Sequence, residues 1–148
     1  MFCFIMAGMG LIKLIFLMLL STTALFSVDI LKSAPVQTNV LALTIDDGPH
    51  PHVTLHILRL LKEENVKATF FLIAKEAQKY PEITKKIIEH GHEIGNHSFS
   101  HQNFQKISLF DVSQSIETSQ AVFKQLLGKK PYYFRAPYGR MNLYQQPL

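Results

Sequence analysis

One short stretch constrains the fold of this chain more than any other. Val40 to Ile45 is apolar and contains β-branched residues, which predicts a short buried strand. This strand runs directly into Asp46 and Asp47, and Gly48-Pro49 then force a tight turn. We therefore expect both carboxylates at the carboxyl end of a strand, where α/β sheets and barrels build their sites. The tetrapeptide Asp46-Asp47-Gly48-Pro49 is also compatible with an ordinary turn, in which one Asp caps the next helix.

The segments that follow alternate between helix and strand patterns. Amphipathic spacing and end signals predict helices over Val53–Glu64, from Pro81 to Gly91 and over Ser108–Leu127. Short apolar runs predict further strands over Ala68–Ile73, His92–Asn96 and Pro131–Arg135. This alternation is typical of a parallel sheet with right-handed crossovers, so the sequence predicts an α/β fold.

Composition favours one globular domain and does not favour nucleic acid as a partner. The 148 residues are enough for one domain with a sizeable core, and 47% of them are hydrophobic while 18% are charged. The formal net charge of +4 comes from scattered lysines, without the basic run that is typical of nucleic-acid binding. The single cysteine, Cys3, excludes an internal disulfide.

The N-terminal segment, Met1 to Ser27, resembles a secretory signal peptide. It is strongly apolar, carries one charge at Lys13, and ends in small residues, so we expect cleavage near its end. The alternative is an uncleaved anchor that associates with a membrane, because the apolar stretch is nearly long enough to span a bilayer. Both alternatives predict a secreted, periplasmic or cell-envelope protein, with residues 28–39 as a linker and residues 40–148 as the domain.

All seven histidines lie between His50 and His101, and two of them are spaced so that they could bind the same metal ion. His97 and His101 are four residues apart, so a helical turn would direct both imidazoles to the same side. Two imidazoles and one carboxylate form a three-ligand site with open positions, which suits catalytic zinc and also non-haem Fe(II). Because the histidines follow one predicted strand and the carboxylates another, we expect a metal there. An unrelated pair of partly buried or surface histidines is the alternative.

The two carboxylates can then divide the chemical work. One would bind the metal, and the other would take a proton from the water that the metal activates. Arg135, at the end of the last predicted strand, could orient the free carboxylate by Coulomb attraction, or could form an ordinary surface salt bridge. Tyr138 offers a backbone N–H for an oxyanion and a ring for stacking, unless it belongs to a simple turn.

Three motifs together resemble those of one known family. Thr44–Pro49 (TIDDGP), His97–His101 (HSFSH) and Arg135–Gly139 (RAPYG) are similar, in order and in position at strand ends, to the first three motifs of the polysaccharide deacetylases. This is carbohydrate esterase family 4, which includes chitin, chitooligosaccharide and peptidoglycan N-acetylglucosamine deacetylases. The resemblance implies a distorted (β/α) barrel with parallel strands. It also implies hydrolysis of N-acetyl groups on a polysaccharide or oligosaccharide, with release of acetate.

The resemblance also implies a role for each matching residue. Asp46 would be the catalytic base, Arg135 would support it, and Tyr138 would lie beside the oxyanion. A divalent metal, usually zinc in this family, would have as its ligands Asp47, His97 and His101. Each carboxylate of the Asp-Asp pair would therefore have a separate task.

The resemblance stops before two later motifs of the family. These motifs carry an Asp with an aromatic wall and the histidine that acts as general acid, and the sequence ends before both. We therefore expect the first half of a deacetylase domain, with a non-catalytic remnant that at most binds metal or glycan as the alternative. The Fe(II) alternative is less favoured, because such oxygenases usually use antiparallel β-scaffolds.

Overall fold

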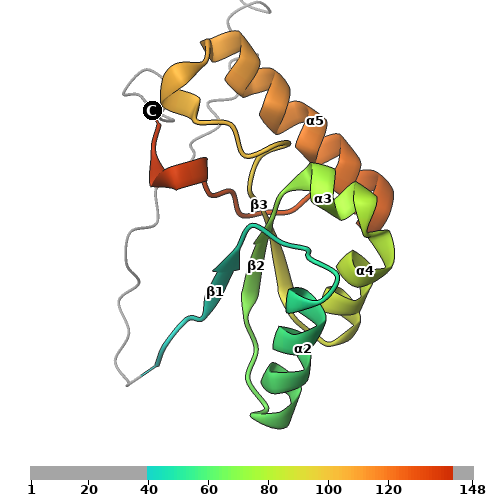
Figure 1. Cartoon of the computed structure of the whole chain (residues 1–148). Coiled ribbons are helices and arrows are strands. Elements are labelled where there is room, and N and C mark those ends of the chain that lie inside the picture. The colour runs from blue at the N-terminus through green and yellow to red at the C-terminus, as the bar shows by residue number, and fades with distance from the viewer. Residues whose placement is uncertain (1–39, 142–148) are drawn as a thin grey trace, which may run out of the picture. The chain divides into compact units, whose positions relative to one another are not determined.

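The structure is a computed structural model that describes residues 40–141, which form a small parallel sheet flanked by helices (Figure 1). The strands are β1 (Thr44–Asp46), β2 (Thr69–Leu72) and β3 (Glu93–Asn96). The helices are α2 (Val53–Glu63), α3 (Ala74–Lys79), α4 (Pro81–Glu89) and α5 (Leu109–Leu127), with 3-10 turns at η1 (Phe104–Lys106) and η2 (Pro137–Gly139). Within the described range, no helix has the length and apolar character needed to cross a bilayer. The predicted signal or anchor segment and the linker lie outside the described residues.

The sheet has the strand order β1-β2-β3, and both neighbouring pairs are parallel. Parallel neighbours need a crossover connection. α2 supplies it between the first two strands, and α3 together with α4 supplies it between the next two. All the strands therefore end at the same edge of the sheet, and the predicted α/β class is confirmed.

The first predicted strand is mostly irregular and exposed. β1 begins only at Thr44, and the preceding Val40 and Leu41 are 62% and 91% exposed. β1 is an edge strand of the described sheet, so only β2 pairs with it, and Ile45 is the side chain of β1 that packs on the core. An apolar run cannot by itself distinguish such an edge from a central strand. The expectation of a buried strand is therefore wrong for the residues that precede β1.

The fourth predicted strand, Pro131–Arg135, is reduced to a single β-bridge. Phe134 pairs in parallel with Asn96. The backbone N–H of Asn96 donates to the carbonyl of Tyr133 at 2.8 Å, and that of Arg135 donates to the carbonyl of Asn96 at 2.9 Å. The ladder extends no further because β3 ends here and its next backbone N–H donates to β2 instead. The segment still runs beside β3, which brings Arg135 to the edge where the strands end.

The predicted helices form close to their expected bounds. Leu58 and Leu61 lie on the buried face of α2, as the amphipathic spacing indicated. α5 begins with a capping box between Ser108 and Asp111 and ends at Gly128, whose φ of 75° is the left-handed conformation that suits glycine. These local end signals make the bounds of α5 predictable from sequence.

The sequence pattern does not predict α3. This helix has 6 residues, too few for a clear amphipathic period, and its buried side chains are the small Ala74 and Ala77. Tertiary hydrogen bonds fix its start. The backbone N–H of Ala74 donates to the carbonyl of Ser98 at 3.0 Å, and the next N–H along the chain donates to the carbonyl of Phe99 at 2.9 Å. α3 therefore holds the loop that follows β3.

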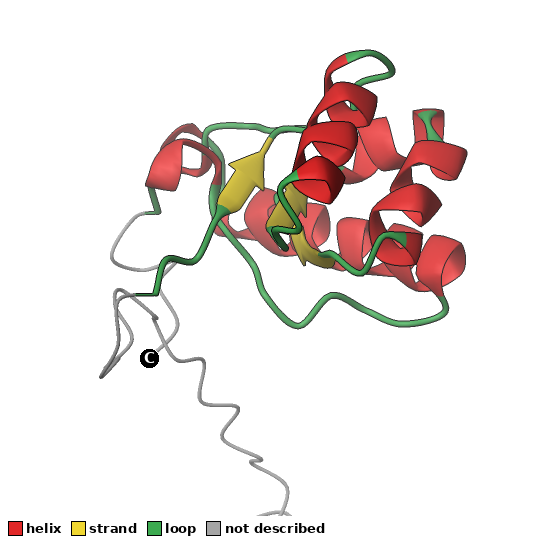
Figure 2. Cartoon of the chain, turned by 90° about the horizontal axis from the view of Figure 1, so that it is seen from below, coloured by secondary structure: helices red, strands yellow, loops and turns green. Residues whose placement is uncertain are grey.

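A hydrophobic core fills the space between the sheet and the helices. Its buried members include Leu58, Phe70, Leu72, Ile87 and Phe123. Figure 2 shows the larger helices grouped beside the strands, with β1 at the margin away from them. The core thus fixes β2 and β3, and β1 attaches to this rigid part through its pairing with β2.

Candidate metal and catalytic site

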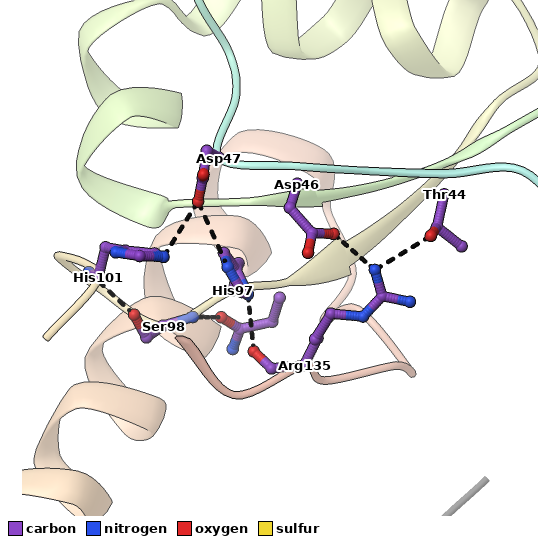
Figure 3. A network of polar contacts seen from close by, with 8 residues as sticks. Thr44, Asp46, Asp47, His97, Ser98, His101 and Arg135 are labelled. Carbon is purple, nitrogen blue, oxygen red and sulfur yellow. Dashed lines mark hydrogen bonds and ion pairs between the residues drawn. The ribbon is translucent and has the colours of Figure 1, made fainter. Parts of the chain in front are cut away.

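The polar residues predicted from separate strand ends lie together at one edge of the sheet (Figure 3). Asp46 ends β1, and Asp47 follows it directly. His97 and His101 lie in the loop after β3. Arg135 comes from the segment that bridges to β3. Residues far apart in the sequence therefore meet in one cluster.

Three side chains of this cluster could hold a metal ion. Their ligand atoms all lie within 4.8 Å of one another, and the residues are Asp47, His97 and His101. Oδ1 of Asp47 lies 3.4 Å from Nε2 of His97 and 3.1 Å from Nε2 of His101. The structure thus brings together the two imidazoles and the carboxylate that the sequence predicts as ligands.

His97 and His101 meet without the helical turn that their spacing suggested. The segment between them is irregular, and Ser98 and His101 have positive φ values of 71° and 58°. The Ser98 hydroxyl accepts a hydrogen bond from the backbone N–H of His101 at 3.0 Å. The backbone N–H of Ser98 donates to Oδ1 of Asn96 at 2.9 Å. Side-chain hydrogen bonds therefore shape this loop in place of helical ones, and the two imidazole centroids lie 5.0 Å apart.

Asn96 ties the histidine loop to α5. Its side chain is fully buried, and its Nδ2 donates to Oγ of Ser119 at 2.7 Å. The Ser119 hydroxyl in turn donates to the carbonyl of Ile116 at 2.7 Å. Because the buried amide is hydrogen-bonded at both ends, it fixes the position of the strand end. Sequence reasoning missed Asn96 and Ser119, since a polar pair that forms across the fold leaves no periodic signal.

His97 has the orientation expected of a metal ligand. The residue is buried, and its Nδ1 lies 2.8 Å from the carbonyl oxygen of Arg135. A carbonyl oxygen only accepts, so Nδ1 carries a proton and donates it. In the neutral imidazole, Nε2 then presents its lone pair toward Asp47. Metal-binding histidines are commonly held by an outer contact of this kind.

The two adjacent carboxylates have different partners. Asp47 has a φ of 74°, in the left-handed region that Asp tolerates better than most residues, and its carboxylate faces the two histidines. Oδ1 of Asp46 instead accepts a hydrogen bond from Arg135 at 2.6 Å. The same guanidinium nitrogen donates to Oγ1 of Thr44 at 3.0 Å. The predicted separation of the two carboxylates therefore has a geometric basis.

Tyr138 lies beside His101 and is exposed. It belongs to η2, has a φ of 60°, and its ring centroid lies 4.7 Å from that of His101. Non-glycine residues with positive φ in the described part of the chain are Asp47, Asn65, Ser98, His101 and Tyr138. All but Asn65 belong to this cluster. Strained backbone of this kind concentrates at functional sites, which supports a functional role for the cluster.

His92 lies elsewhere and is held in the core. Its Nδ1 accepts a hydrogen bond from the backbone N–H of Ala68 at 3.3 Å, between the starts of β2 and β3. Burial lowers the pKa of His92, and the nearby Lys67 and His90 lower it further. His92 is therefore a satisfied core histidine in its neutral form.

Comparison with known proteins places the chain in a family. A family model for polysaccharide deacetylases matches residues 33–146. The chain belongs to the polysaccharide deacetylase family. It is 42% identical over 109 residues to a peptidoglycan-N-acetylglucosamine deacetylase of Bacillus cereus, an alignment that covers 74% of this chain and 40% of the relative. It is 41% identical over 98 residues to a chitooligosaccharide deacetylase of Azorhizobium caulinodans, covering 66% and 47%.

A solved structure confirms the fold of the chain. A family 4 acetyl xylan esterase from Clostridium thermocellum, in complex with a cobalt ion, is similar with a TM-score of 0.66 and 34% identity. The similarity covers 70% of this chain and 51% of the esterase. The parallel sheet and its helices are thus part of a β/α barrel, as the family resemblance implied. The chain spans about half the length of its relatives or less.

Proposed function

We propose that the protein hydrolyses N-acetyl groups on the amino sugars of a cell-envelope glycan and releases acetate, in a metal-dependent reaction. One observation carries this proposal: three metal-ligand atoms converge beside a second carboxylate that an arginine holds. The relatives support the substrate class, because one is named for peptidoglycan N-acetylglucosamine and the other for chitooligosaccharides.

The three ligands fit a divalent metal, and we propose zinc. Two imidazole nitrogens and a carboxylate oxygen are donors that zinc binds, and three protein ligands leave positions open for water and substrate. The Nε2 lone pair of His97 faces a carboxylate oxygen of Asp47, an arrangement that a cation between them would stabilise. The cobalt ion of the C. thermocellum esterase also supports a metal of this type.

Asp46 is the proposed base of the reaction. When bound, the metal supplies Lewis-acid polarisation and lowers the pKa of water. Arg135 holds Oδ1 of Asp46, which leaves Oδ2 available to accept the proton of the attacking water. The water oxygen then adds to the acetyl carbonyl carbon, the proton taken from the water passes to the leaving nitrogen, and cleavage of the C–N bond yields acetate and the free amine. Because Arg135 stays charged throughout, it stabilises Asp46 in a fixed orientation.

Tyr138 is proposed to lie beside the developing oxyanion. Its ring contacts that of His101, so η2 lies beside one of the proposed metal ligands. A backbone N–H directed at an oxyanion stabilises the tetrahedral intermediate, and loss of one such donor typically costs about 10²–10³-fold in rate. Tyr138 is 61% exposed, which leaves its ring accessible to a sugar.

We also propose an extracytoplasmic location. Met1 to Ser27 has the features of a signal peptide, and residues 28–39 would link it to a catalytic domain over residues 40–148. An uncleaved anchor would place the same domain at a membrane surface. Both arrangements suit a glycan substrate of the envelope.

Acetate release tests the proposal. The full-length protein, loaded with zinc, should release acetate from N-acetylglucosamine oligomers or from peptidoglycan. Chelation should abolish this activity and added zinc should restore it. Asp46→Asn should lower the rate by about 10²–10⁴-fold, the usual effect of losing a positioned base. Lys85→Ala is the control, because Lys85 forms only an exposed ion pair with Glu82. Zinc binding without acetate release from either substrate would contradict the proposal.

A further inference from the structure

One row of residues across the sheet leads from the proposed base to a glycine. Asp46 of β1 pairs with Phe71 of β2, and Phe71 pairs with Gly95 of β3. Residues at matching positions of neighbouring strands point to the same face of a sheet. The carboxylate of Asp46 and the ring of Phe71 therefore share a face with the position where Gly95 lacks a side chain.

The ring of Phe71 occupies the space that a side chain at position 95 would need. A Cβ on Gly95 would lie 2.5 Å from both Cδ1 and Cε1 of Phe71. Carbon atoms in contact are normally about 3.5–4.0 Å apart, so the ring would have to move. A glycine is therefore required at position 95, because a side chain there would displace the ring of Phe71.

Arg135 lies over this ring. Its Cζ is 4.1 Å from the centroid of Phe71, which is within the range of a cation–π contact. Arg135 comes from the segment beside β3, while its guanidinium binds Thr44 and Asp46 on β1 (Figure 3). Its side chain must therefore cross β3 and β2, and it does so where Gly95 leaves room and Phe71 offers a flat surface.

We propose that Phe71 and Gly95 are positioning residues for the base Asp46 and that they act through Arg135. This inference rests on the proposed deacetylase function. The side chain of Arg135 is 36% exposed and that of Asp46 is 35% exposed, so the ion pair between them is partly exposed to solvent. Exposed ion pairs of long side chains are held weakly. Phe71 is only 7% exposed, and this fixed ring limits the orientations open to the guanidinium.

Kinetics of a ring-deleting variant test this role. Phe71→Leu should lower kcat by about 10- to 100-fold, because the base loses its fixed orientation. KM and zinc affinity should change little, since in the proposed mechanism Phe71 acts on the orientation of the base and supplies no metal ligand. Phe71→Tyr keeps the ring and should retain kcat. Gly95→Ala should behave like Phe71→Leu, because the new methyl group displaces the ring.

The neighbouring phenylalanine provides a matched control. Phe70 is also buried, but its register partners are Ile45 and Ile94, so its ring lies on the opposite face of the sheet. Phe70→Leu should lower the unfolding temperature and leave the kcat of the folded enzyme unchanged. An equal loss of kcat in Phe70→Leu and Phe71→Leu would overturn the inference.

Two further measurements separate this inference from the proposed function. In an Arg135→Ala background, Phe71→Leu should cause no additional loss of kcat, because its effect passes through Arg135. In NMR spectra of the full chain, the ring current of Phe71 should shift the Arg135 side-chain signals upfield, and Phe71→Leu should remove that shift. Fully additive losses, or unshifted Arg135 signals in the unmodified protein, would overturn the inference. If the protein shows the NMR shift but releases no acetate, the contact between Phe71 and Arg135 stands and the deacetylase proposal is refuted.

Discussion

The imidazole of His97 and the backbone carbonyl of Arg135 are joined by a hydrogen bond of 2.8 Å between residues 38 positions apart. Arg135 therefore serves two parts of the site. Its carbonyl orients a proposed metal ligand, and its guanidinium holds the proposed base, Asp46. Because a substitution of Arg135 changes the side chain and keeps the carbonyl, the two roles can be separated.

We predict that Arg135→Ala lowers kcat and keeps the metal. Removing a hydrogen bond between two charged groups should lower the rate by about 10- to 100-fold. Zinc content should stay near that of the unmodified protein, because the carbonyl that binds His97 remains. Steady-state kinetics and elemental analysis of the purified protein check both parts. Zinc loss comparable to that of His97→Ala would show that the two roles are not separable.

The two carboxylates should respond differently to amide substitution. Asp47→Asn should lower zinc affinity strongly, because Asp47 supplies the only carboxylate among the three proposed ligands. Asp46→Asn should leave zinc affinity nearly unchanged, since its carboxylate faces Arg135. Competition titration with a zinc chelator measures both affinities, and His101→Ala serves as a second ligand variant. Equal loss of zinc in the two Asn variants would contradict the assigned roles.

Asn96→Ala should destabilise the fold and loosen the metal site. The change leaves the buried backbone N–H of Ser98 without its acceptor, and Ser119 keeps its bond to the carbonyl of Ile116 but loses the donor from Asn96. Leaving buried polar groups unpaired typically costs about 1–3 kcal/mol. Urea unfolding monitored by circular dichroism measures the loss of unfolding free energy. Ser113→Ala, on the exposed face of α5, is the control and should change stability by less than about 0.5 kcal/mol. Equal stabilities of the two variants would refute this account of the buried amide.

Stability should fall in mildly acidic solution because of His92. Its pKa is lowered in the folded state from the ordinary value of 6.5, chiefly by burial. When the pH falls below about 6.5, the unfolded chain therefore binds a proton before the folded protein does, and the unfolding free energy decreases. The decrease should continue until the pH reaches the lowered pKa.

His92→Gln isolates this effect, because its amide oxygen can still accept from the backbone N–H of Ala68. Urea unfolding of the metal-free protein at pH 8 and pH 5.5 should show a smaller drop in this variant than in the unmodified protein. The exposed His56→Gln is the control and should keep the full drop. The idea fails when His92→Gln and His56→Gln show the same dependence on pH.

Export should remove the N-terminal segment. If Met1 to Ser27 is a signal peptide, the mature protein should begin near Leu25 or Val28. N-terminal sequencing of protein from the medium or envelope checks this expectation. Recovery of Lys13 in membrane-extracted protein would favour the anchor instead.

The sequence predicts those parts of the fold that depend on local chemistry. α5 has a capping box at one end and Gly128 at the other, and both signals lie within a few residues of its bounds. Asp46 and Asp47 lie at the carboxyl end of a strand because Gly48-Pro49 follows them and ends it. The three-ligand cluster is also predictable, because parallel strands all end at one edge of a sheet.

Features that depend on distant neighbours are not predictable in this way. The exposure of Val40 and Leu41 reflects an edge strand, which no local pattern reveals. His97 and His101 approach through the hydrogen bonds of Ser98, although their spacing suggested a helix. The contact between Phe71 and Gly95 exists only because β2 and β3 pair in one register.

The order of synthesis gives the separation of Asp46 and Arg135 a further consequence. The two residues are 89 positions apart, and Arg135 follows His97 by 38 positions. At about 5–20 residues per second, a ribosome adds those 38 residues in about 2–8 s. During this interval the nascent chain already contains Asp47 and His97 but not the arginine that holds Asp46. The carbonyl of Arg135 orients His97 and its guanidinium holds Asp46, so the proposed metal site and the proposed base are both completed only when this later segment has been made.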